Sequence, residues 1–335
     1  MVVKKRLLYV DAFRGLAIVL MVFLNVFDYV SVYDIHTEEP FYILLLNSVT
    51  ILPPILLFSF VSGMSALLLT DSVKKKTLNF LQFIKKVTLR YGKYFLLSIP
   101  FTFFMWGLKV FYTWEEAIQG LSISSIITCL ILYYVRDKRK LICLTVIIYL
   151  LQSFLLFSWR SYGFTGSIPF SDDFTILGLL VNLIFRGWFS ISNLVPFMLV
   201  GAVFLENFRE SRVNLNILIA LASFLVVITL WPIVPVDYYM RSFTLIFYVA
   251  GMCGVITSII YYLTMLGSMF KILRTFGLVS FEAYILHFLL AKAIRLLGMG
   301  DALPFIPASI ISFSVLLLFY IIGSFYIKTV KKQVL

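Results

Sequence analysis

The sequence RLLYVDAFRGLAIVLMVFLNVFDYVSVYDIH occupies residues 6–36 and carries the strongest signal for the architecture of this chain. Its apolar part, with flanking residues, is long enough to cross a bilayer as a helix. Asp11, Arg14 and Asn25 interrupt that apolar part, and His36 follows in a short polar segment. A polar side chain inside a spanning helix is costly unless it is paired or hydrated. Each of these residues is therefore a candidate functional residue.

The composition excludes a soluble globular protein. Of the 335 residues, 61% are hydrophobic and 13% are charged, and the mean hydropathy is +1.01. Apolar runs of about twenty residues recur, which is the length that a membrane-spanning helix needs. The formal net charge of +12 comes from residues between these runs, so the positive-inside rule explains it better than nucleic-acid binding. The three cysteines lack the spacing of a zinc site or a disulfide framework, and no metal is expected.

We predict an all-α, polytopic membrane protein with about ten spanning helices in a single domain, residues 1–335. The spans are expected near residues 9–30, 41–70, 91–111, 117–135, 141–159, 189–206, 214–232, 243–267, 276–297 and 307–327. A basic connection before residue 91 includes an amphipathic segment that is expected to lie along the inner surface. Segment 176–188 is expected to be a short re-entrant or interfacial element. Basic turns such as 136–140 (RDKRK) place both termini in the cytoplasm.

Two composite motifs resemble one known family. The first is Asp-x-x-Arg-Gly-Leu-x-Ile, an apolar run, Asn, and a His eleven residues later. It is similar to the heparan-alpha-glucosaminide N-acetyltransferase catalytic-domain family, part of the wider transmembrane acyltransferase group. The second is Gly-x-x-Ser-x-x-x-Tyr-x-x-His, which resembles a helix found across that group. The matching residues are Asp11, Arg14, Gly15, Asn25 and His36 in the first motif, and Gly277, Ser280, Tyr284 and His287 in the second.

The resemblance is strongest over residues 6–70 and 274–297 and implies a transmembrane acyltransferase-like fold. It also implies transfer of an acetyl or other acyl group from cytoplasmic acyl-CoA to an amine or hydroxyl on the outer side. The acceptor would be a sugar or glycolipid. Relatives can be dimeric, so a homodimer is compatible with it. The expected location is a prokaryotic cell membrane.

His36 and Asn25 are the predicted catalytic residues. Acyl transfer needs a base for the acceptor's proton, and histidine titrates in the required range. The Asn25 amide would donate to the carbonyl oxygen that gains charge in the tetrahedral intermediate. Without such chemistry, His36 is a solvated loop histidine and Asn25 forms a hydrogen bond between helices. Direct transfer and an acyl-His36 intermediate both fit the sequence.

The donor carries several phosphate charges, so it needs cations near the cytoplasmic boundary. Arg14 is the first candidate, held by Asp11 one helical turn away; the alternative is a purely structural ion pair. Arg90 and Lys93 are further candidates for this role.

Other residues are predicted to contact the donor's path or the acceptor. Ser280 and His287 share one helix face, at i and i+7, and are expected to line the donor's path. The alternative for His287 is a buried structural histidine. Asn193, Arg241 and Asp34 are predicted to bind the acceptor, although an interfacial anchor explains Arg241 equally well.

Two other functions fit the same residues. A transporter or flippase for an acidic or glycolipid substrate would line its pathway with Arg14, Asn25 and Glu282, and the Pro53-Pro54 break would act as a gate. A non-catalytic relative would only bind lipid or partner helices. Thioester consumption that depends on His36 would distinguish acyl transfer from these two functions.

Overall fold

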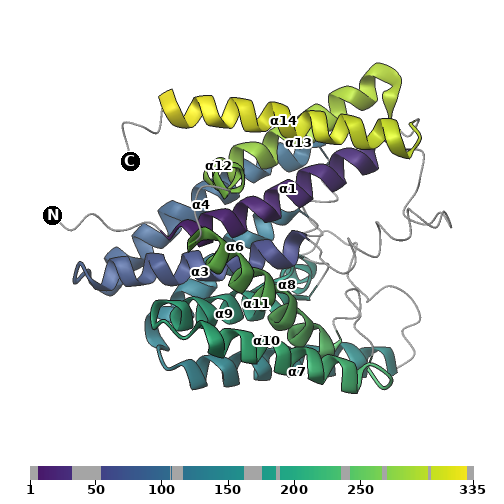
Figure 1. The fold of residues 1–335 in the computed structure, drawn as a ribbon. Helices are drawn as coiled ribbons and strands as arrows, with labels where there is room; N and C mark the ends of the chain where they lie inside the picture. Colours follow the sequence, from purple (N-terminus) through teal and green to yellow (C-terminus); the bar gives the residue numbers. More distant parts are fainter. Residues whose placement is uncertain are drawn as a thin grey trace. The chain divides into compact units, whose positions relative to one another are not determined.

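The computed structural model describes residues 7–31, 54–105, 107, 116–161, 176–185, 189–234, 242–265, 270–300 and 303–329. The regular elements of this part are helices, apart from one bridge between Ser31 and Leu303 (Figure 1). The helices are α1 (Leu8–Val30), α3 (Pro54–Lys74), α4 (Phe80–Met105), α6 (Ala117–Tyr134), α7 (Lys138–Ser161), α8 (Ile176–Phe185), α9 (Ile191–Arg209), α10 (Val213–Leu230), α11 (Phe243–Met265), α12 (Lys271–Leu278), α13 (Ser280–Ile294) with the π-helical turn η2 (Arg295–Met299), and α14 (Phe305–Thr329). The all-α prediction is confirmed for these residues.

The architecture is that of a multi-pass membrane protein. Within the described ranges, seven helices are long and apolar enough to cross a membrane, or eight if the bent pair α12 and α13 forms one span. Two further long helices, α4 and α7, have 26 and 24 residues; α7 begins with Lys138, Arg139 and Lys140, and α4 carries its basic residues between Lys85 and Lys93. The count of ten spans and the side on which the termini lie stay predictions.

One predicted helix boundary is wrong. The helix expected at 91–111 begins at Phe80 and ends at Met105, so the amphipathic segment is the first part of α4. The segment expected as one span at 276–297 contains a break that was not predicted, because α12 and α13 meet at Val279 with a bend of 81°. The backbone of Val279, with φ −110° and ψ 24°, leaves the helical region and ends α12.

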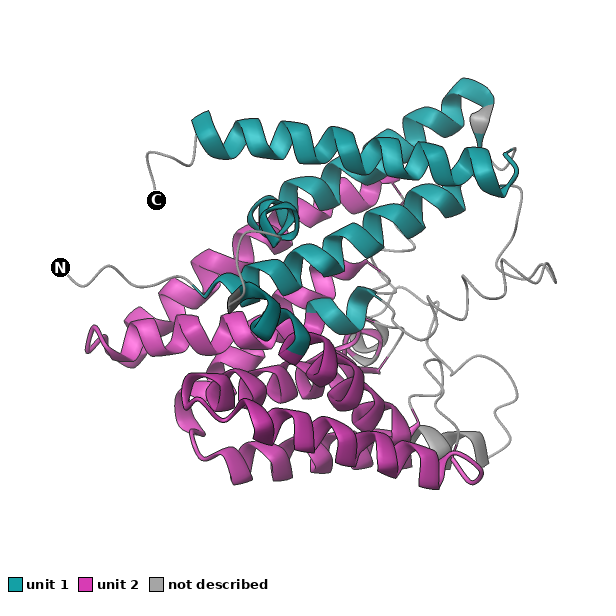
Figure 2. Cartoon of the chain, viewed as in Figure 1, with its two compact units in different colours: residues 1–58, 259–335 teal, residues 59–258 magenta. Residues whose placement is uncertain are grey.

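The chain forms two compact units (Figure 2). Unit 1 contains Met1–Phe58 and Ile259–Leu335, and unit 2 contains Ser59–Ser258. Helices α3 and α11 each pass from one unit into the other. Unit 1 therefore combines both motifs that resemble the acyltransferase family, although they lie at opposite ends of the sequence.

In unit 2 the central helix is α9, in which 15 of 19 residues are buried. It packs against α6, α7, α8 and α10. Two glycines let α3 and α9 touch: a Cβ at Gly63 would overlap the Met198 carbonyl oxygen, and one at Gly201 would overlap that of Phe60. Small residues at helix contacts are typical of membrane bundles, where backbones approach closely.

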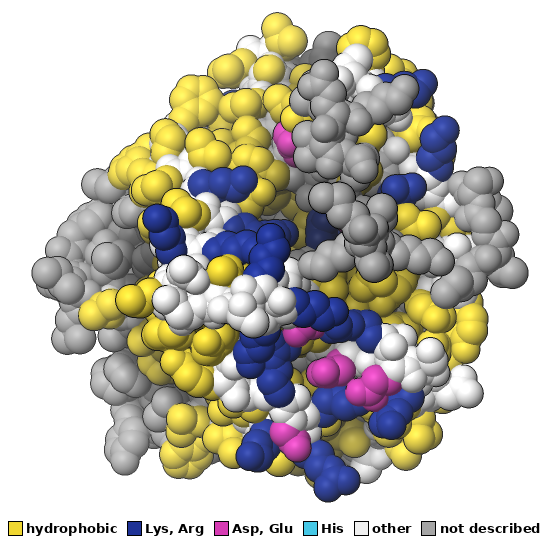
Figure 3. All heavy atoms as spheres, turned by 90° about the vertical axis from the view of Figure 1, so that its left-hand side faces the viewer, with side chains coloured by type: hydrophobic (Ala, Val, Ile, Leu, Met, Phe, Trp, Pro, Cys, Tyr) yellow, Lys and Arg dark blue, Asp and Glu magenta, His cyan; other side chains and the backbone are white. Residues whose placement is uncertain are grey.

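One end of unit 2 carries an ion-pair network. Arg136 and Arg209 both pair with Asp71, and Lys138 pairs with Glu210 at 2.6 Å. These residues come from α3, from the turn before α7 and the first residue of α7, and from the end of α9 with the residue that follows it. Figure 3 shows a face on which Lys and Arg side chains gather around a smaller group of Asp and Glu side chains. The predicted inner turns of this unit therefore meet at one end of it.

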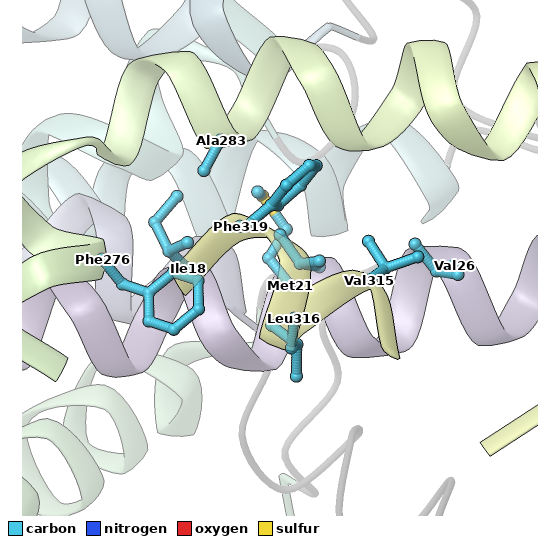
Figure 4. Close-up of a cluster of buried hydrophobic side chains, with 9 residues drawn as sticks. Ile18, Met21, Val26, Phe276, Ala283, Val315, Leu316 and Phe319 are labelled. Atoms are coloured by element: carbon cyan, nitrogen blue, oxygen red, sulfur yellow. The ribbon is translucent and has the colours of Figure 1, made fainter. Parts of the chain in front are cut away.

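In unit 1 the central helix is α1, which contacts α12, α13 and α14. Its apolar side chains pack with theirs in one buried cluster (Figure 4). The cluster contains Ile18, Met21, Val22, Val26, Phe276, Ala283, Val315, Leu316 and Phe319. Lipid tails are as apolar as these side chains, so the gain within a bilayer is close packing rather than removal from water. This packing holds the C-terminal motif against the N-terminal one.

Candidate functional site

The two family-like motifs meet at a pair of glycines. A Cβ at Gly15 of α1 would overlap the carbonyl oxygen of Leu273 in α12, and one at Gly277 would overlap the carbonyl oxygen of Asp11. The helices therefore touch backbone to backbone, an approach that residues with a side chain prevent. This crossing places the Asp11–Arg14 turn of α1 beside the C-terminal end of α12.

Arg14 bridges the two helices at this crossing. Its Nη1 donates to Oδ1 of Asp11 at 3.3 Å and to the carbonyl oxygen of Gly277 at 3.4 Å. Asp11 is buried, and 23% of the Arg14 side chain is exposed. Carbonyl groups in the last turn of a helix lack partners within it and favour a nearby cation. The pair is thus a structural element of the α1–α12 contact; its role toward a donor stays a prediction.

At the middle of α13, a second polar contact joins the two motifs. Nδ2 of Asn25 in α1 lies 3.0 Å from Nε2 of His287, and Nδ1 of His287 lies 3.1 Å from the Ala283 carbonyl oxygen. An amide nitrogen only donates and a carbonyl oxygen only accepts. Nε2 of His287 is therefore the acceptor, and Nδ1 carries the hydrogen. The two contacts define a neutral imidazole in one tautomer.

The surroundings of the Asn25–His287 pair are aromatic. His287 is completely buried, and its ring contacts those of Tyr284 and Phe288 at centroid distances of 5.6 and 4.0 Å. Tyr29 packs edge-on against Phe288 at 6.4 Å. The side chain of Asn25 is half-buried and makes one hydrogen bond to the described residues. Its second N–H and its carbonyl oxygen are thus left for another group.

Other predicted donor residues lie as follows. Ser280 begins α13, so Ser280, Tyr284 and His287 occupy one helix at the predicted spacing. Arg90 and Lys93 lie on α4 in unit 2 and are exposed. Their charged groups lie 5.9 Å and 4.8 Å from the ring centroids of the neighbouring Tyr91 and Tyr94.

The predicted acceptor residues are only partly described. Asn193 is buried at the start of α9 in unit 2. His36, Asp34 and Arg241 lie outside the described residues. Among the described residues, no group of three or more His, Cys, Asp or Glu side chains could hold a metal ion.

Sequence analysis missed one charged residue with unusual surroundings, Arg136. It was interpreted only as a marker of the cytoplasmic side. Its Nη1 donates to Asp71 at 2.6 Å, whereas Nε and Nη2 are buried without a hydrogen-bond partner among the described residues. The signal for it was an acidic residue, Asp71, near the end of another apolar segment.

Comparison of the chain with models of protein families and with curated proteins finds no match. The resemblance to the acyltransferase group therefore rests on the sequence motifs alone.

Proposed function

We propose that the chain is an integral-membrane acyltransferase of the heparan-alpha-glucosaminide N-acetyltransferase type. It would move an acetyl or other acyl group from cytoplasmic acyl-CoA to an amine or hydroxyl of a sugar or glycolipid. In this proposal about ten helices span a prokaryotic cell membrane, and both termini lie in the cytoplasm. The observation that supports it best is the hydrogen bond between Asn25 and His287, which joins the two motifs.

In the proposed reaction, His36 takes the proton of the acceptor amine or hydroxyl. The acceptor's electron pair then attacks the carbonyl carbon of the thioester. The carbonyl oxygen gains negative charge in the tetrahedral intermediate. The carbon–sulfur bond breaks as this intermediate collapses. The coenzyme A thiolate leaves and takes up the proton. A hydrogen-bond donor held toward this oxyanion stabilises the transition state more than the bound substrate, so it lowers the activation barrier of the transfer.

Asn25 is suited to be that donor because its amide orientation is set by His287. One N–H of Asn25 is used in the bond to Nε2, and the second points elsewhere in the plane of the amide. His287 is itself held by the Ala283 carbonyl oxygen, so its ring does not turn freely. His287 is then a positioning residue. It does not act as the base, because both ring nitrogens are already engaged.

Arg14 is the proposed donor-side cation. Its guanidinium is oriented by Asp11 and by the Gly277 carbonyl oxygen. A guanidinium held in one orientation suits the phosphate groups of coenzyme A. Arg90 and Lys93 stay candidates for the same role, since both are exposed cations.

The experiment is acceptor-dependent release of coenzyme A thiol. Purified protein receives acetyl-CoA and a panel of amino sugars, with His36→Ala beside the wild type. The proposal expects thiol release that needs an acceptor and that His36→Ala abolishes. Folded wild-type protein that neither binds acetyl-CoA nor releases thiol would overturn it.

A transporter is the second candidate, and the 81° bend at Val279 favours it. Transporters often place substrates at the break of a discontinuous helix. In this case, proteoliposomes would take up a glycolipid or acidic substrate without consuming thioester. Uptake without thiol release would select the transporter, and thiol release without uptake would select the transferase.

A further inference from the structure

A cluster of aromatic rings lies where two helices of membrane-spanning length end in unit 2. The helices are α3, whose last residue is Lys74, and α6, whose last residue is Tyr134. The ring of Tyr133 stacks on that of Phe83 in α4, with centroids 4.4 Å apart, and the ring of Phe80 lies 5.6 Å from those of Tyr133 and Tyr134. Aromatic residues at the ends of spanning helices typically lie at the level of the lipid head groups. This aromatic cluster therefore marks one membrane–water boundary of unit 2.

Lys74 is held against the aromatic cluster. Its Nζ donates to the carbonyl oxygen of Tyr133 at 2.6 Å and lies 5.0 Å from the centroid of the Tyr133 ring. The last carbonyl groups of a helix favour a cation, and the face of an aromatic ring attracts one. An ammonium group has three N–H donors, so the bond to Tyr133 leaves two of them for another group. Lys74 is exposed, and a molecule outside the chain can reach these donors.

The positive charge around Lys74 is not balanced by carboxylates. Residues 72–114 contain no Asp or Glu. Lys74, Lys75 and Lys76 are exposed, and none of them forms an ion pair with a described residue. The carboxylate one turn before Lys74 belongs to Asp71, which already pairs with two arginines. The three lysines therefore present their charge to an anion from outside the chain.

An apolar strip on α4 begins beside these lysines. Leu81, Leu89 and Leu96 are 63–75% exposed. Their spacing of eight and seven residues places them on one face of the helix. Leu81 directly follows Phe80 of the aromatic cluster. The strip thus runs from the aromatic cluster toward the middle of the helix, in the direction that an acyl chain takes from its head group.

Charge and position together select the class of ligand. Ammonium groups form charge-assisted hydrogen bonds with phosphate, and basic clusters beside spanning helices typically bind anionic lipids. A soluble anion would contact the lysines but leave the leucine strip unused. An uncharged lipid would contact the leucine strip but leave the lysines without a counter-charge. An anionic phospholipid matches both features.

We propose that Lys74, Lys75 and Lys76, together with the aromatic cluster, bind the head group of an anionic phospholipid whose acyl chains lie along α4. The lipid is a resident ligand of the α3–α4 turn and not an acceptor of an acyl group. The proposal depends on contacts within unit 2 alone and does not rest on acyl transfer.

A specific site differs from the general attraction of a basic surface for anionic lipid. Such attraction depends only on the amount of charge, so any exposed lysine contributes equally to it. At a specific site, the loss of binding is largest where a lysine is held in place. Lys271→Gln is therefore the matched control, because it removes the same charge from an exposed lysine at the start of α12 in unit 1.

The test uses the delipidated full chain in an uncharged detergent. Native mass spectrometry counts the bound lipids, and thermal unfolding gives the melting temperature. The probes are phosphatidylglycerol, phosphatidylcholine, inorganic phosphate and coenzyme A. The variants are Lys74→Gln, the triple variant Lys74→Gln/Lys75→Gln/Lys76→Gln, and Lys271→Gln.

The proposal expects phosphatidylglycerol to bind wild type more tightly than phosphatidylcholine and to raise its melting temperature. Lys74→Gln should bind phosphatidylglycerol about fivefold more weakly and the triple variant about 100-fold more weakly, whereas Lys271→Gln keeps the wild-type affinity. Without lipid, all variants should melt close to wild type, since the substituted lysines are exposed. A loss of binding then reports the site and not the fold.

Four results would overturn the proposal. Equal binding of the two phospholipids would remove the requirement for negative charge, and an equal loss in Lys271→Gln and Lys74→Gln would leave only general attraction. Inorganic phosphate that raises the melting temperature as much as phosphatidylglycerol would identify a site for a soluble anion. Displacement of phosphatidylglycerol by coenzyme A would assign the lysines to the acyl donor instead.

Discussion

Nδ2 of Asn25 donates a hydrogen bond of 3.0 Å to Nε2 of His287, across 262 positions of sequence. The contact joins the first apolar helix to the helix that carries the C-terminal motif. His287 in turn donates to the Ala283 carbonyl oxygen, so the orientation of the Asn25 amide is set by α13. A change at His287 should therefore reach the chemistry through Asn25.

A double-mutant cycle measures this coupling. Asn25→Leu and His287→Phe should each lower the free energy of unfolding, and the double variant should lose less than their sum. The expected coupling is about 1 kcal/mol, the usual range for a hydrogen bond between membrane helices. Unfolding in mixed micelles provides the measurement. Ser65→Ala is the control, because its hydroxyl donates to Val61 in its own helix and should not couple to Asn25.

The glycine crossing of α1 and α12 predicts a strong effect of a single methyl group. Gly15→Ala should lower the free energy of unfolding by about 3 kcal/mol, because the new Cβ meets the Leu273 backbone, which cannot turn away. Gly92→Ala is the matched control in α4. Its Cβ would meet only a methyl carbon of Thr88 at 3.6 Å.

Gly92→Ala should leave the free energy of unfolding unchanged or raise it by up to about 1 kcal/mol, since alanine is the better helix former. Thermal unfolding of the two variants beside wild type gives the comparison. Equal stability of both variants would show that the α1–α12 contact is looser than described.

The network around Asp71 predicts a salt-dependent loss of stability. Asp71→Asn removes the acceptor shared by Arg136 and Arg209. The three side chains are 20–33% exposed, so the loss should be only about 1 kcal/mol. Melting temperatures of wild type and Asp71→Asn at low and high salt check this. Salt weakens the wild-type ion pairs, so the difference in melting temperature between the two proteins should be smaller at high salt. A difference that salt widens would contradict the network.

Glu210 predicts a dependence on pH. The hydrogen bond from Lys138 at 2.6 Å lowers the pKa of Glu210 from its ordinary value of 4.5. Its contribution to stability is therefore present above pH 4.5 and is lost as the pH falls through the lowered folded-state pKa. Glu210→Gln should melt below wild type at neutral pH, and the gap should close in acid. A gap that grows in acid would refute this assignment.

Much of the architecture was predictable because apolar runs of spanning length are a strong signal. The break at Val279 was not, since valine is common within apolar helices and the break shows only in its backbone angles. Gly15 and Gly277 belong to the motifs, but their mutual contact depends on how α1 and α12 cross.

The candidate site was predicted residue by residue rather than as an arrangement. Asn25 and His287 are each predicted as polar groups in apolar helices, Asn25 at the reacting carbonyl group and His287 along the path of the donor. Their hydrogen bond requires that two distant helices pack together, which spacing within one helix does not reveal.

The most direct measurement of the central claim is the rate of acceptor-dependent thiol release by wild type, Asn25→Leu and Gly92→Ala, each shown to be folded. If Asn25 stabilises the oxyanion, Asn25→Leu should lower the rate by about 10²–10³, while Gly92→Ala keeps it. Acetyl-CoA binding should persist in both variants, because the loss falls on the transition state. Equal rates for Asn25→Leu and wild type would contradict the proposed role of Asn25, and no thiol release by wild type would contradict the transferase itself.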